Sequence, residues 1–167
     1  LRHFVKRAGS PSEVLVKLNR DLNERMRKDM FITLFLAFID TEKNVLTYSR
    51  AGHEPALLRR ASGEVETLRG DGMALGMVPN ELFEEIVEDG TTPFESGDLL
   101  VLYTDGVTET INRDKEEYSL ERLKAKLDRI ADKSVKSFHD DLLRDLDAFA
   151  GDANEPDDVT LISARRH

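Results

Sequence analysis

Leu99-Leu-Val-Leu-Tyr-Thr-Asp-Gly106 is a run of apolar, strand-favouring residues that ends in an acidic turn. A second acidic motif, Pro156-Asp-Asp158, stands directly before another apolar run, Val159-Thr-Leu-Ile162. If the two runs form neighbouring strands, their carboxylates meet at one edge of a sheet and can hold a hard divalent cation through oxygen atoms alone. The two motifs together predict a metal-dependent enzyme.

Each motif also has an ordinary structural interpretation. An Asp-Gly pair after a strand is a common hairpin turn, and Asp157-Asp158 after a proline can simply begin a strand. Placement favours a metal site, because a carboxylate beside a buried strand is costly unless it is paired, hydrogen-bonded or bound to metal. Both interpretations stay open at this point.

Composition narrows the classes of function. The 167 residues are predicted to form a single domain over 1–167, and the net charge of −9 gives no basic surface for nucleic acid or for an anionic membrane. The absence of cysteine excludes disulfides, thiolate zinc sites and cysteine nucleophiles. The longest apolar stretch, Met30–Ile39, is about half the length of a membrane-spanning helix. We expect metal ions and other proteins as partners, and the cytoplasm as the location.

The first half of the chain is predicted to be one helix followed by antiparallel strands. Ser10 fits an N-cap, Pro11 the first helical position, and Glu13 completes a capping box. Strand-like patterns and turn signals then alternate. The expected elements are a strand over 31–39, a turn over 40–44, a strand over 45–49, a hairpin of 55–60 with 64–68, a loop over 70–79 and a strand over 82–87.

The second half ends in two helices and a last strand. Apolar residues at helical spacing predict helices over Ser119–Ile130 and Val135–Phe149, and Gly151 ends the second helix. Helices and strands are grouped and do not alternate, which favours an α+β fold over a doubly wound parallel sheet.

The acidic motifs belong to a longer series. Leu99–Glu109, followed about fifty residues later by Pro156-Asp-Asp-Val-Thr160, resembles the metal-dependent protein phosphatase (PPM) superfamily in its bacterial SpoIIE/RsbU-like branch. The resemblance extends in the same order through Met30–Phe35, Ala51–Pro55, Ala74–Gly76 and Glu121–Leu123. It implies a four-layer α-β-β-α sandwich of two antiparallel sheets, with a two-metal site at one end.

The resemblance also implies a chemistry. In this family two Mn²⁺ or Mg²⁺ ions activate a water that attacks the phosphorus of phosphoserine or phosphothreonine directly. Asp105 and Asp157 match the catalytic metal ligands, and Gly106 is a further candidate metal ligand. Asp158 matches a position behind the ligands, since neighbouring residues of an extended chain point to opposite sides. Glu109 matches an auxiliary acidic group, or is a solvated carboxylate.

Loop residues before the acidic motifs also bear on the site. His53 lies in the loop Gly52-His-Glu-Pro55 and is either a surface histidine or a group that contacts substrate near the metal site. Arg50 and Ala74 stand where the family usually has asparagine and proline. The family's remaining metal ligands come from strands before the first helix, so we expect this chain to be N-terminally truncated relative to the family's fold and to hold about half of a metal site.

Three classes of function follow. The first is a serine/threonine phosphatase acting on a phosphorylated partner, in this branch a STAS-type anti-anti-sigma factor, with dimerisation as a further possibility. The second is a non-catalytic protein-binding module of the same fold. The third is a generic calcium- or magnesium-binding α+β domain, which is disfavoured because Asp152-Ala-Asn154 lacks the rest of a calcium-loop pattern.

Overall fold

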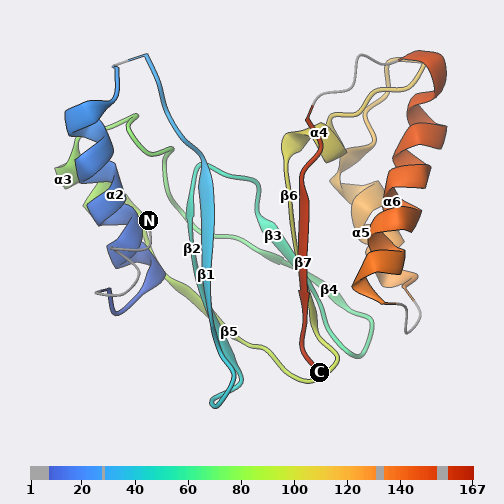
Figure 1. Cartoon of the computed structure of the whole chain (residues 1–167), viewed down its shortest axis with the longest axis horizontal. Helices are drawn as coiled ribbons and strands as arrows, with labels where there is room; N and C mark the ends of the chain where they lie inside the picture. Colours follow the sequence, from blue (N-terminus) through green and yellow to red (C-terminus); the bar gives the residue numbers. More distant parts are fainter. Residues whose placement is uncertain (1–7, 28, 131–133, 154–157) are drawn as a thin grey trace. The chain divides into compact units, whose positions relative to one another are not determined.

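The computed structural model describes residues 8–27, 29–130, 134–153 and 158–167. Two compact units share the chain. One comprises residues up to Pro55 together with Leu68–Glu95, and the other comprises Ala56–Thr67 and Ser96–His167. Each unit is built on its own antiparallel sheet with helices beside it, which confirms the α+β class with two antiparallel sheets (Figure 1).

Among its described residues, the first unit contains a three-stranded sheet in the order β1-β2-β5 and two helices. Its elements are α2 (Pro11–Arg25), β1 (Leu34–Asp40), β2 (Val45–Ala51), α3 (Asn80–Ile86) and β5 (Gly90–Pro93). The predicted N-cap is confirmed, because the Ser10 side chain accepts a hydrogen bond from the Glu13 backbone N–H. Its apolar core joins Leu15 of α2 to Ala51, Leu75, Phe83 and Val87.

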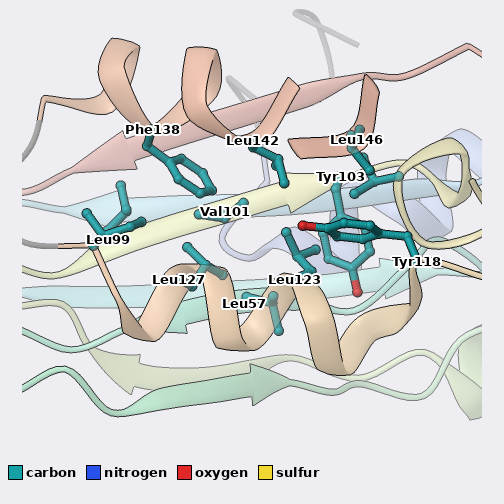
Figure 2. Packing of buried hydrophobic residues seen from close by; sticks show 12 residues of the cluster. Leu57, Leu99, Val101, Tyr103, Tyr118, Leu123, Leu127, Phe138, Leu142 and Leu146 are labelled. Carbon is teal, nitrogen blue, oxygen red and sulfur yellow. The ribbon is translucent and has the colours of Figure 1, made fainter. Parts of the chain in front are cut away.

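The second unit contains a four-stranded sheet in the order β4-β3-β6-β7, with three α-helices. Its elements are β3 (Ala56–Arg59), β4 (Val65–Leu68), β6 (Leu99–Tyr103), α4 (Asp105–Thr108), α5 (Ser119–Asp128), α6 (Val135–Ala150), the 3-10 helix η1 (Gly151–Ala153) and β7 (Leu161–Arg165). Figure 2 shows side chains of α5 and α6 converging on those of β6, including Leu123, Phe138 and Val101.

Three predictions for the strands were wrong. Residues 82–86 lie in α3 and Val87 caps it, because Phe83 and Val87, four residues apart, pack with Leu15 of α2 while the glutamates of α3 are exposed. The first strand begins at Leu34, since Ile32 makes only an isolated bridge to Leu75. The last strand covers Leu161–Arg165 rather than Val159–Ile162.

A buried ion pair fixes the start of β6. Asp98 is 2% exposed, and its carboxylate accepts hydrogen bonds from Arg60 Nη1 and from the Ala61 N–H, both at 3.0 Å. Glu66 binds the same guanidinium, and these partners, Glu66 first, raise the pKa of Arg60. The hairpin β3–β4 is therefore attached to β6 at the end opposite Asp105.

Candidate active site

The strands that carry the two acidic motifs are neighbours. β6 pairs with β7 antiparallel, with Tyr103 opposite Leu161 and Leu99 opposite Arg165. The end of β6 therefore lies beside the start of β7, as Figure 1 shows. This confirms the predicted side-by-side arrangement and places Asp105 and the segment that enters β7 at one edge of the sheet.

Thr104 joins the two segments beyond the last strand pair. Its Oγ1 donates to the backbone oxygen of Asp158 at 3.1 Å and accepts from the Thr160 N–H at 2.9 Å. Its backbone N–H also donates to the Thr160 oxygen at 3.1 Å. Sequence reasoning missed Thr104, because a threonine before Asp-Gly has no distinguishing pattern until its neighbour across the sheet is known.

Asp105 is the first residue of the short helix α4 and is exposed. Its Oδ1 accepts the Gly106 N–H at 2.9 Å, and its backbone oxygen accepts the Glu109 N–H at 2.7 Å. The segment is thus a helical turn, not the hairpin that Asp-Gly alone also allows. The turn holds the carboxylate at the sheet edge, where it remains accessible.

Gly106 is buried where the two acidic segments touch. A Cβ atom at this position would lie 2.7 Å from the backbone oxygen of Asp158, which is closer than real side chains approach. The contact needs a glycine for steric reasons. The Gly106 oxygen accepts the Thr110 hydroxyl at 2.7 Å, which fixes the far side of the turn.

The other predicted positions of this unit are on its surface or outside the described residues. Asp158 and Glu109 are both exposed. Asp157 lies outside the described residues, so its role as a ligand stays a prediction. Asp98, although it also borders β6, is a structural carboxylate that Arg60 neutralises.

His53 belongs to the first unit and is half-buried. Its Nδ1 accepts the Glu54 N–H at 2.6 Å, and its backbone oxygen accepts Arg50 Nη1 at 2.6 Å. Arg50 also donates from Nε to the Gly70 oxygen at 2.9 Å. The arginine that departs from the family pattern therefore links the His53 turn to the loop after β4.

His139 lacks any motif in the sequence, yet it has a defined partner. Its Nε2 lies 2.9 Å from Ser163 Oγ, and the pair connects α6 to β7. Because neither residue borders Asp105, we assign the pair to structure. No pattern along the chain could have predicted it, since 24 residues separate the two side chains.

The donors at the sheet edge fit a hard divalent cation. The exposed Asp105 carboxylate and nearby backbone oxygens supply oxygen ligands, with neither thiolate nor imidazole among them. Within the described ranges, no group of three or more acidic or histidine side chains converges closely enough to bind a metal. The assignment of Asp105 as a metal ligand therefore stays a prediction.

Comparison with known proteins gives the family. The profile described as Stage II sporulation protein E (SpoIIE) matches residues 1–167. The chain belongs to the SpoIIE family. This confirms the resemblance to the SpoIIE/RsbU-like branch of the PPM superfamily.

Individual relatives agree with this assignment. The chain is 34% identical over 160 residues to phosphoserine phosphatase RsbU of Bacillus subtilis, covering 93% of the chain and 45% of that relative. It therefore spans about half the length of that protein. The SiaA-PP2C domain of Pseudomonas aeruginosa has a TM-score of 0.84 at 18% identity, over 99% of this chain and 65% of that one.

A second solved structure shares the fold. The phosphatase domain of SpoIIE from Bacillus subtilis, presoaked with Mn, has a TM-score of 0.69 at 20% identity, over 99% of this chain and 69% of that one. At these identities the structures establish the fold, with its two antiparallel sheets and flanking helices. No helix in the described part of the SpoIIE-family chain is long and apolar enough to cross a membrane.

Proposed function

We propose that this chain is the catalytic domain of a metal-dependent protein phosphatase, which hydrolyses phosphoserine or phosphothreonine on a regulatory partner. The observation that carries the proposal is the β6–β7 pairing, which brings Asp105 to the sheet edge where β7 begins, close to Asp158. The name of RsbU, a phosphoserine phosphatase 34% identical to this chain, supports the same reaction.

The proposed site has a division of roles. Asp105 and Asp157 would hold two Mn²⁺ or Mg²⁺ ions, with Asp158 behind them, the Gly106 backbone beside them and Glu109 at an auxiliary position. Bound divalent cations would neutralise phosphoryl oxygens and acidify the attacking water. The presoak of the SpoIIE phosphatase domain with Mn supports manganese as the first ion to test.

The residues of this chain would hold the metal-binding carboxylate in place and keep it accessible to substrate. The turn of α4 presents the Asp105 carboxylate to solvent, and Thr104 binds the backbone of Asp158 and Thr160. Arg50 would position the His53 turn, whose imidazole we propose as a substrate contact. The partner would be a phosphorylated protein of the anti-anti-sigma type with a STAS fold, and the location would be the cytoplasm.

The test is an Asp105→Asn substitution in the natural protein that contains this chain. With Mn²⁺ and a phosphoserine protein, we expect turnover to fall by roughly 100-fold or more while the fold persists, because an amide cannot replace a charged ligand. Asp128→Asn, at the exposed end of α5, makes the same chemical change away from the site and serves as the matched control.

Two results would contradict the proposal. Turnover by Asp105→Asn equal to that of wild type would remove Asp105 from the chemistry. Wild-type protein that binds its phosphorylated partner but never releases phosphate with Mn²⁺ or Mg²⁺ would instead identify the non-catalytic binding module.

A further inference from the structure

A groove runs between α5 and α6 on the second unit. Its volume is about 690 Å³, and the described residues that line it include Tyr118, Arg122, Arg129, Phe138 and Phe149. The lining extends along α5 and includes the residues at both of its ends, Tyr118 and Ile130, and the ten residues of α5 span about 15 Å at the rise of an α-helix. This length suits about three turns of a peptide helix better than a compact small molecule.

Two of the residues that line the groove have small side chains. Ala125 on α5 and Ala148 on α6 are both exposed and line the groove. The lining also includes Ile130 near one end and Phe149 near the other. A bulky aliphatic side chain of a partner can therefore seat between the two helices and bury apolar surface.

The charges of the α6 wall are already balanced. Asp145 accepts a hydrogen bond from the Tyr118 hydroxyl at 2.5 Å and pairs with Lys126 at 3.1 Å. Asp141 pairs with Arg144 at 2.7 Å. The acidic groups on this wall are thus neutralised by partners within the same unit.

The α5 wall, the side of the groove lined by residues of α5, carries two positive charges that no described acidic side chain of the groove pairs with. Arg122 and Arg129 are exposed, and neither makes an ion pair with a residue in the part of the chain that the structure describes. They are seven residues apart, so they lie on one helical face about 10 Å from each other. This local excess contrasts with the net charge of −9 of the whole chain.

One of the two arginines is held in place. The Arg122 guanidinium stacks on the Phe149 ring, 4.8 Å from its centroid, and Phe149 in turn packs edge-on against Tyr118. Stacking lowers the entropy that the side chain loses on binding a carboxylate. The groove is therefore partly organised for an anionic ligand before any ligand arrives.

We propose that the α5–α6 groove docks an acidic amphipathic helix of a protein partner. The partner helix would carry two carboxylates seven residues apart, which pair with Arg122 and Arg129, and aliphatic side chains between them, which seat over Ala125 and Ala148. The docking surface is separate in sequence and function from Asp105, so it does not depend on the proposed phosphatase activity.

The probe is a fluorescein-labelled helical peptide of fourteen residues, with glutamates at positions 3 and 10 and leucines at positions 6 and 7. We expect saturable binding by fluorescence anisotropy that weakens with salt. The double substitution Arg122→Glu and Arg129→Glu should raise the Kd at least about tenfold. A peptide with lysines in place of both glutamates should bind the double variant and regain most of the lost affinity.

The matched control is Lys124→Glu. Lys124 is on the same helix but about 200° round the axis from Arg122, and it does not line the groove, so its charge reversal should leave the Kd within about twofold. Circular dichroism checks that each variant is folded, and both arginines are at exposed positions that tolerate substitution.

Three results would overturn the proposal. The first is no saturable binding of the acidic peptide to folded wild-type protein. The second is equal affinity for the acidic and the lysine peptide, or for wild type and the double variant. The third is a concentration-dependent dimer of wild type that the double variant loses, because a second copy of the chain would then be the occupant.

Discussion

At the level of single residues, the geometry of the candidate site depends on the two neighbours of Asp105 in the chain. Asp105 matches a ligand by motif, but Thr104 and Gly106 decide where its carboxylate lies. Thr104 binds the chain on both sides of Val159, and Gly106 allows the two backbones to touch. The steric requirement at Gly106 can be tested without any ligand.

Gly106→Ala should destabilise the second unit. The added methyl group would lie 2.7 Å from the Asp158 oxygen, so one backbone must shift, at a cost of about 1–3 kcal/mol in the free energy of unfolding. Urea denaturation measures the change. Gly70→Ala is the control, since its Cβ would meet no atom closer than 3.9 Å. Equal free energies of unfolding for the two variants would show that the backbone at Asp158 can move away from the added methyl group at no cost.

Tyr118→Phe should change stability and its dependence on pH. Burial, together with the hydrogen bond to Asp145, raises the pKa of Tyr118, while the same bond holds the pKa of Asp145 below its usual value. The Asp145 contribution is therefore present at neutral pH and is lost as the pH falls below about 4. Loss of the bond should cost about 1 kcal/mol at pH 7.

At alkaline pH the effect of Tyr118 on stability runs in the opposite direction. Below about pH 10 the phenol is neutral in both states, whereas above it the unfolded chain releases the proton first, so wild-type stability falls as the pH rises. Urea denaturation between pH 9 and 11 should show a shallower decline for Tyr118→Phe. Parallel curves would show that Tyr118 does not cause the decline.

At the scale of the element, the end of α5 is fixed by a side chain from another strand. Arg59 of β3 donates from Nε to the Leu127 oxygen and from Nη2 to the Ile130 oxygen, both at 2.9 Å. These carbonyls belong to the last turn of α5 and the residues that follow it, where positive charge also complements the helix dipole. The helix that carries the α5 wall of the groove is thus attached to the sheet.

Arg59→Leu should therefore lower the free energy of unfolding by about 2 kcal/mol, because two carbonyls lose charged donors. Arg59→Lys should recover only part, since an ammonium group cannot bind both oxygens with fork geometry. Thermal unfolding followed by circular dichroism gives the comparison. Arg25→Leu, at an exposed i,i+4 pair, is expected to cost less than about 0.5 kcal/mol. If Arg59→Leu lowers the free energy of unfolding no more than Arg25→Leu does, Arg59 does not anchor the end of α5.

At the scale of the whole molecule, metal binding should couple to folding. A cation that binds only the folded state stabilises it by about 1.4 kcal/mol at ten times its Kd. We expect Mn²⁺ to raise the Tm of the natural protein and EDTA to reverse the shift. Asp105→Asn should abolish the shift, and Asp128→Asn should retain it. A shift that survives in Asp105→Asn would place the ion elsewhere.

Elements with strong local signals can be predicted from the amino-acid sequence. The capping residues before α2, the apolar stripes of α5 and α6, Gly151 at the end of α6 and the apolar run of β6 are each sufficient, because capping and periodic burial act within a few turns of chain. The ordered motifs also identified the family. The strand β5 was not predicted, because Gly90-Thr-Thr-Pro93 lacks the alternation of apolar and polar residues that is typical of a strand.

Features that depend on contacts between distant segments became visible in the folded chain. The short run 82–87 became a helix because Phe83 and Val87 pack on α2, which outweighs a pattern equally compatible with a strand. The antiparallel pairing of β6 with β7 fixed Asp105 at the sheet edge where β7 begins, close to Asp158, and the packing of α5 beside α6 created the groove. Periodicity specifies which face of an element is apolar, but the partner that covers it is set by the free energy of packing over the whole unit.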